Sequence, residues 1–208
     1  MTSEEAFHQA EEKIEKVRRS GGQTLIFYGT LLSELPGALL QLRQLWSLDL
    51  SYNQLMELPE WIGQLEELKS LNLRNNKLIA VPESLGQFYL LHSLDLSQNR
   101  LNELPELFGN LKQLQSLNLS ENQLTALPEP LEQLAKLQSL SLHSNQLTVL
   151  SVSLGNLAQL QFLELSNNLL TTLPASLGNL TQLQSLKLSN NRLTKLPKSL
   201  GKLTQLQF

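Results

Sequence analysis

The chain has 208 residues, of which 41% are hydrophobic but only 5% are aromatic, so its core must be filled by aliphatic side chains. The formal net charge of −3 excludes the basic surplus that general nucleic-acid binding or anchoring to an anionic membrane requires. The sequence has no cysteine, which excludes a disulfide framework and a thiolate metal site.

Composition also predicts the compartment. Extracellular repeat proteins of this size usually carry disulfides, so the lack of cysteine favours a reducing environment. The first residues, MTSEEAFHQAEEKIEKVRRSGG, are charged throughout and lack the apolar stretch of a signal peptide. No apolar run approaches the length of a membrane span. We therefore expect a cytoplasmic protein that does not bind membranes.

Residues 1–22 are predicted to form an N-terminal capping helix. Thr2 and Glu5 have the spacing of a capping box, and Gly21 and Gly22 provide a stop signal. The apolar residues fall on one helical face at spacings of three and four: Phe7, Ala10, Ile14 and Val17. We expect this face to cover the first edge of the core, and binding of a partner by the helix is the alternative.

Residues 23–208 are predicted to form one repeat solenoid. Its first repeat, 23–44, is degenerate, with Thr30 where the later repeats have Asn. Seven regular repeats follow over residues 45–205. Their Asn recurs every 23 residues without an insertion or a deletion: Asn53, Asn76, Asn99, Asn122, Asn145, Asn168 and Asn191.

Each repeat has the same predicted local structure. The pair Leu48 and Leu50, repeated in every later unit, alternates with period two and indicates a short strand with both leucines inward. A Leu-Pro pair such as Leu58-Pro59 ends this segment, and we expect the Pro to be the first residue of a short helical or 3₁₀ return. One repeat buries too few side chains to offset the entropy of ordering its backbone, so the repeats must stack on one another.

The Asn column is predicted to be structural rather than to contact a ligand. It follows each strand, where the chain turns sharply and backbone groups point inward. A short side chain with one acceptor and two donors can bridge main-chain groups of its own and of adjacent repeats. We call these seven residues the Asn ladder.

The frame L-x-x-L-x-L-x-x-N-x-L-x-x-L-P resembles the leucine-rich-repeat family over residues 25–208. This resemblance implies an α/β repeat solenoid, a horseshoe with a parallel concave sheet and short helical or 3₁₀ convex returns. It also implies a scaffold for protein binding, often in signalling.

A second resemblance concerns the N-terminal repeat region of bacterial Roco proteins. The charged helix ending in VRRSGG, the degenerate first repeat and the 23-residue repeats are similar to that region, which in the family precedes a Ras-like GTPase. The present sequence contains no G-x-x-x-x-G-K-[ST] loop. Because Leu206 opens a further repeat, we expect a longer polypeptide with a possible further domain C-terminal to Phe208.

The candidate binding surface is the concave sheet. Outward residues form three columns, which start at Ser47, Asp49 and Ser51 and continue every 23 residues. Eight strands about 4.8 Å apart give a face of about 35–40 Å, which suits a protein or an extended peptide. Binding hot spots are enriched in aromatic residues and Arg. We predict that the contact energy comes from Tyr28, Asp49, Tyr52, Arg74, Asp95, His143, Phe162 and Glu164. Neutral variation of a solvated surface is the alternative for any one of them.

Catalysis and cofactors are not expected. His143 lies near Ser120, Ser166 and Glu164 in the repeat frame, but an open sheet offers no oxyanion hole and no water-excluding pocket. The three histidines have no metal-ligand spacing with carboxylates, so we expect no metal site. The two tryptophans, Trp46 and Trp61, are predicted to be packing residues.

Three functional hypotheses remain open. The first is a cytoplasmic protein-recognition module without enzymatic activity. The second is a regulatory repeat domain of a larger Roco-type GTPase. The third is a structural role through self-association of the last repeat.

Overall fold

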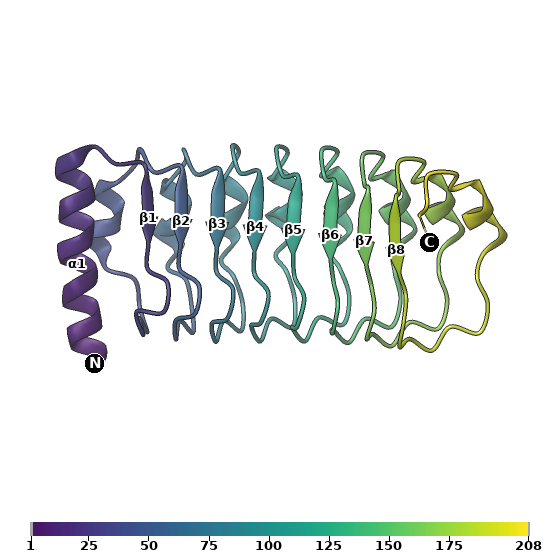
Figure 1. Ribbon diagram of the computed structural model, residues 1–208, viewed down its shortest axis with the longest axis horizontal. Helices are drawn as coiled ribbons and strands as arrows, with labels where there is room; N and C mark the ends of the chain where they lie inside the picture. Colours follow the sequence, from purple (N-terminus) through teal and green to yellow (C-terminus); the bar gives the residue numbers. More distant parts are fainter. Residues whose placement is uncertain (1, 208) are drawn as a thin grey trace.

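The computed structural model describes residues 2–207. Within this range one strand per repeat forms an eight-stranded parallel sheet, and the strands lie in sequence order from β1 to β8 (Figure 1). The strands are β1 Thr24–Ile26, β2 Ser47–Asp49, β3 Ser70–Asn72, β4 Ser93–Asp95, β5 Ser116–Asn118, β6 Ser139–Ser141, β7 Phe162–Glu164 and β8 Ser185–Lys187. Each residue pairs with the residue 23 positions later, as Leu48 does with Leu71. The predicted parallel solenoid is confirmed.

A 3₁₀ helix returns the chain behind each strand. These helices are η1 Gly37–Gln41, η2 Glu60–Gln64, η3 Glu83–Gln87, η4 Glu106–Asn110, η5 Glu129–Gln133, η6 Val152–Asn156, η7 Ala175–Asn179 and η8 Lys198–Lys202. The proline lies one residue earlier than predicted. Pro59, with φ −69° and ψ 147°, is the extended N-cap, and its carbonyl accepts the first helical hydrogen bond, from Ile62 N–H at 3.0 Å. Proline fixes φ but leaves ψ free, so it can take the extended conformation of an N-cap, and here it precedes the return.

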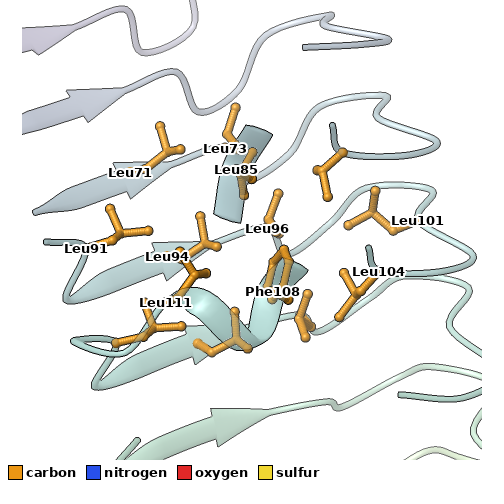
Figure 2. Packing of buried hydrophobic residues seen from close by; sticks show 14 of the residues in the cluster. Leu71, Leu73, Leu85, Leu91, Leu94, Leu96, Leu101, Leu104, Phe108 and Leu111 are labelled. Atoms are coloured by element: carbon orange, nitrogen blue, oxygen red, sulfur yellow. The ribbon is translucent and has the colours of Figure 1, made fainter. Parts of the chain in front are cut away.

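The core lies between the sheet and the returns and is almost entirely leucine. Figure 2 shows Leu71 and Leu73 of one repeat against Leu94 and Leu96 of the next, with Phe108 from the return η4 beside Leu96. All five are at most 1% exposed. The core is therefore continuous from one repeat to the next, as stacking requires. Its burial decreases in the last repeat, where the side chains of four leucines are only partly buried: Leu186, Leu188, Leu193 and Leu200.

Five glycines set how closely adjacent returns approach. A Cβ built on Gly155 would lie 2.4 Å from the carbonyl oxygen of Ser176, and one on Gly178 would lie 2.5 Å from that of Ser199. Glu132 occupies this slot in η5, and η5 packs less closely against η6 than the other regular returns pack against one another. A side chain in the slot thus accompanies looser packing of two returns, while the strands β5 and β6 of the same repeats pack as closely as the others.

Helix α1, Ser3–Ser20, packs against η1 and β1 at one end of the sheet (Figure 1). The capping box of Thr2 and Glu5 is present, and Gly21 ends the helix with φ 65°. The buried face differs slightly from the predicted one. Ala6 is 1% exposed, whereas Phe7 is only partly buried. The small Ala6 permits close approach of the helix to the first repeat.

The Asn ladder ties consecutive repeats together. The side-chain amide of Asn76 donates to the carbonyl of Leu73 in its own repeat and to that of Leu50 in the preceding repeat, both at 3.0 Å. Its oxygen accepts the N–H of Leu55 at 3.0 Å. The same three bonds recur at every regular ladder position from Asn53 to Asn191. Thr30 of the first repeat instead donates to Asn53 Oδ1 at 3.0 Å.

Candidate binding surface on the concave face

The concave face is defined here as the outward side chains of β1–β8 and of the three residues that follow each strand. The inward leucines of β2–β7, such as Leu48 and Leu50, are buried, so the intervening residues face out. Most of these are small and polar. This face is open to solvent along its whole length, because the returns cover only the opposite face of the sheet (Figure 1).

The third column is less exposed than the sequence suggests. Its serines Ser51, Ser97, Ser120 and Ser166 are all buried, at 1–8% exposure. The N–H and hydroxyl of Ser51 both donate to Oδ1 of Asp49, at 2.8 and 2.6 Å, and Ser97 makes the same two bonds to Asp95. An Asp carboxylate of the second column thus holds Ser51 and Ser97 against the ends of their strands. Of the predicted contact residues, Asp49 therefore has one carboxylate oxygen engaged. Asp95 has both engaged, because its Oδ2 also accepts from the side-chain amide of Asn118 at 3.2 Å.

An aromatic group lies at the β1–β2 end of the concave face. The rings of Tyr28 and Tyr52 are 5.0 Å apart and tilted by 47°, and the two residues are 60% and 37% exposed. The guanidinium of Arg74 lies 5.9 Å from the centre of the Tyr52 ring and donates to Gln98. Ile26, absent from the predicted set, is 48% exposed in the slot that Asp49 holds in the next repeat. An apolar residue in a polar column was the available signal for it.

A polar hollow of about 310 Å³ lies over the middle strands. It brings together the predicted residues Arg74, His143 and Glu164. It also includes Glu121, which was not predicted; this residue accepts a hydrogen bond from Gln98 at 3.0 Å. Glu121 occupies the left-handed turn position, with φ 55°. This position lies outside the three predicted columns of outward residues.

His143 is held by polar neighbours and not by a catalytic arrangement. Its Nε2 lies 3.0 Å from the hydroxyl of Ser144, and its Nδ1 lies 3.4 Å from the amide nitrogen of Asn167. The hydroxyl of Ser120 pairs with that of Ser141 at 2.6 Å. No hydrogen bond between residues 2–207 joins His143 to Ser120 or Ser166. The geometry offers no activated serine.

A second hollow, of about 330 Å³, lies over β6–β8 and shares Ser141 and Glu164 with the first. Phe162 forms its wall and is 47% exposed, with the small Ser139 and Ser185 in the paired positions on either side. The two hollows adjoin at Ser141 and Glu164, and we call them together the groove.

Glu164 lies at the junction of the two hollows. Lys187 Nζ lies 3.2 Å from its Oε2, and Ser166 N–H donates to its Oε1 at 2.9 Å. Partial burial opposes ionisation of Glu164, but the hydrogen bonds from Ser166 and the ammonium of Lys187 outweigh this effect and lower its pKa. The carboxylate is therefore charged at neutral pH.

The two tryptophans have different surroundings. Trp61 is partly buried and packs against the leucine core, as predicted. The prediction that Trp46 is a packing residue is wrong. Trp46 directly precedes β2 and is 44% exposed, and the ammonium of Lys69 lies 4.1 Å from the centre of its ring. Within residues 2–207 there is no cluster of three or more metal-ligating side chains, and no helix has the length and apolarity to cross a membrane.

The parallel sheet, the 3₁₀ returns and the Asn ladder define a repeat solenoid whose units are joined by hydrogen bonds from buried Asn side chains. Models of leucine-rich-repeat families match most of the chain: a leucine-rich repeat region at residues 62–152, and leucine-rich repeats at 136–193 and 44–65. The chain is a leucine-rich-repeat protein. Such repeats are generally interaction modules and not enzymes.

Solved structures of the same family resemble the chain closely. A leucine-rich-repeat protein of Leptospira interrogans is 35% identical with a TM-score of 0.77, over 93% of this chain and 56% of that one. The ectodomain of the plant receptor kinase GASSHO1/SCHENGEN3 from Arabidopsis thaliana, in complex with CASPARIAN STRIP INTEGRITY FACTOR 2, is 35% identical with a TM-score of 0.77, over 88% and 23%. TLR13 in complex with ssRNA13 is 29% identical with a TM-score of 0.81, over 94% and 29%.

The chain spans little more than half of the first of these structures and less than a third of the other two. No curated protein gives a significant match.

Proposed function

We propose that the chain is a protein-interaction module that binds a protein or peptide in the groove of its concave face. The observation that carries this proposal is Phe162, an aromatic side chain left 47% exposed between two serines on an otherwise small, polar surface. An exposed aromatic ring beside an apolar hollow is the type of anchor at which binding energy concentrates. The complex of the similar plant receptor with its factor agrees with a protein or peptide ligand.

Nucleic acid is not the proposed ligand, although the similar TLR13 is in complex with single-stranded RNA. The concave face carries Asp49, Asp95, Glu121 and Glu164 against only Arg74 and Lys187. The whole chain has a net charge of −3. A surface with more carboxylates than cations repels the phosphate backbone. A cytoplasmic, non-catalytic scaffold in signalling is the form of this proposal that the composition favours.

The test is selection of binders from a displayed library of protein fragments, followed by variants of the chain. Phe162→Asp and Arg74→Glu are expected to abolish binding, while the thermal unfolding midpoint stays within about 2 °C because both side chains face solvent. The matched controls are Tyr89→Asp and Arg43→Glu, which are exposed on the return side. Equal loss of binding with the controls would contradict a concave site.

The Roco-type alternative, a regulatory repeat domain acting on a linked GTPase, is a more specific form of the same proposal. It is supported by the charged helix α1 followed by 23-residue repeats. Sequencing the gene beyond Phe208 tests it. A G-x-x-x-x-G-K-[ST] motif downstream would support the alternative, and a stop codon directly after Phe208 would eliminate it.

A further inference from the structure

Three features of the concave face lie along one diagonal: the aromatic group at β1–β2, the polar hollow over the middle strands, and the Phe162 hollow over β6–β8. From their chemistry we propose that the ligand is an extended peptide segment that crosses the strands, with an apolar anchor at each end about eight residues apart and a Lys or Arg between them. This inference rests on the proposed function and specifies its ligand.

The Phe162 hollow is suited to one large apolar side chain. Its exposed surface is mainly apolar, and the half-exposed ring of Phe162 forms its wall. The residues paired with Phe162 in β6 and β8 are serines, which are too short to cover either side of the ring. A ligand side chain that fills this space removes apolar surface from water on both partners.

The second anchor position is the aromatic group of Ile26, Tyr28 and Tyr52. All three side chains are at least 37% exposed, and the tilted pair of tyrosine rings presents both faces and edges. Arg74 lies beside Tyr52 and limits the group on the side of β3. Tyrosine pairs of this kind bind apolar and aromatic side chains with little loss of side-chain entropy.

The separation of the two anchors sets the length of the ligand. Tyr52 follows β2 and Phe162 begins β7, so five strand spacings of about 4.8 Å separate them across the sheet, about 24 Å. They also lie at opposite ends of their strands, about five residues or 17 Å apart along the strand direction. The diagonal is about 29 Å, which an extended chain covers in about eight residues at 3.3–3.6 Å each.

The surface between the anchors favours an extended chain over a helix. A helix docks through a continuous apolar stripe of residues three and four apart. Here the anchors are separated by serines and amides, with no exposed apolar side chain among the concave residues of β3–β6. An extended peptide satisfies this pattern because its polar central residues and its backbone face polar groups of the groove.

The charges in the groove favour a ligand with a cationic side chain near the centre of the groove. Lys187 pairs with Glu164, and Arg74 lies against Tyr52 and Gln98. Glu121 lines the polar hollow and has no cation within ion-pair distance in the part of the chain that is described. A Lys or Arg three to five positions from the Phe162 anchor would reach Glu121 across the polar hollow.

The experiment uses synthetic fluorescein-labelled 12-residue peptides of Ser and Thr that carry Leu or Phe at two positions eight residues apart. One series has Lys three, four or five positions from one anchor, in both orientations, and a matched series has Glu there. Fluorescence polarisation with the full chain measures Kd. We expect the best Lys peptide to bind about tenfold more tightly than its Glu counterpart. Glu121→Gln should reduce this ratio at least threefold, while Glu129→Gln, in the return η5, should leave it unchanged.

The outcomes separate this inference from the proposed function. Equal affinity for the Lys and Glu peptides, or for peptides with any spacing of the anchors, overturns the inference about the ligand. If that binding is lost in Phe162→Ser, the proposed binding site on the concave face still stands. Binding unaffected by Phe162→Ser overturns both. If no peptide binds while fragments from the displayed library do, the ligand is a folded surface and the inference is wrong. Tyr89→Ser is the matched aromatic control, 58% exposed on the return side.

Discussion

The side-chain oxygen of Asn122 accepts a hydrogen bond from the backbone N–H of Leu101, 21 residues earlier and in the preceding repeat, at 3.0 Å. The amide of Asn122 also donates to the carbonyls of Leu96 and Leu119, both at 3.0 Å. One side chain thus serves three buried backbone groups of two repeats. The stability of the solenoid depends on these groups being satisfied.

Asn122→Ala is therefore expected to lower the free energy of unfolding by about 1–3 kcal/mol, because buried polar groups lose their partner and no water reaches them. Urea denaturation followed by circular dichroism measures this loss. Asn102→Ala, at an exposed position of the same turn region, is the control and should change the unfolding midpoint very little. Similar losses in the two variants would show that the ladder bonds are not the cause.

The glycine slot of the returns gives a second prediction. A Cβ at Gly155 would lie 2.4 Å from the carbonyl oxygen of Ser176, so Gly155→Ala is expected to lower the free energy of unfolding by about 1–3 kcal/mol. Gly201 holds the same slot in η8 and has nothing within 4 Å of its Cβ position, so Gly201→Ala should be neutral or slightly stabilising. Destabilisation by Gly201→Ala as large as that by Gly155→Ala would refute the steric explanation.

Helix α1 should show a specific dependence on pH. The guanidinium of Arg18, and then that of Arg19, lowers the pKa of Glu15 from its ordinary value of 4.5 to about 2. A carboxylate with a lowered pKa stabilises the folded state above its ordinary pKa, and this contribution is lost as the pH falls from 4.5 towards about 2. The difference in melting temperature between the natural chain and Glu15→Gln should therefore be present at neutral pH and vanish in this acidic window. A difference independent of pH would contradict the ion-pair explanation, and an NMR titration of Glu15 gives the pKa directly.

Tyr52 allows binding to be separated from stability. It has φ 58°, a left-handed conformation that Asn75, Asn167 and Asn190 adopt at the equivalent positions. Asn tolerates this conformation better than Tyr, but Tyr52→Asn also loses the contact with Tyr28, worth about 0.5–1.5 kcal/mol. We expect the unfolding free energy to change by less than about 1 kcal/mol while affinity for any selected ligand falls. Undiminished affinity, measured by titration calorimetry, would remove the aromatic group from the binding surface.

The fold could be predicted from the sequence because one rule is applied eight times. The 23-residue period places Leu48 and Leu50 inward, and the same offset makes each strand pair in register with the next. A strand, a turn and a return within each unit leave few alternative arrangements. The position of Pro59 outside the return was not predictable from the pattern, since both positions satisfy the preference of proline for φ near −65°.

The candidate surface could be predicted only in part. Alternation along a strand places Phe162 outward correctly, but it breaks down where the strand ends. At that point Ser51 turns back onto Asp49 and is 1% exposed. Glu121 was not predicted because it lies in the turn after β5. The direction of its side chain is set by its own left-handed backbone conformation and not by the period of the strand. Side-chain direction beyond a strand depends on local hydrogen bonds, which a repeat pattern does not encode.

Among residues 2–207, direct contacts between elements join only adjacent repeats, and α1 contacts only the first repeat. Insertion or deletion of a whole 23-residue unit would therefore leave every remaining contact of the same kind as before. The length of the groove is then a quantity that gene duplication can adjust in steps of one strand spacing, about 4.8 Å. Ligands longer or shorter by one to two residues would be accommodated without any redesign of the core.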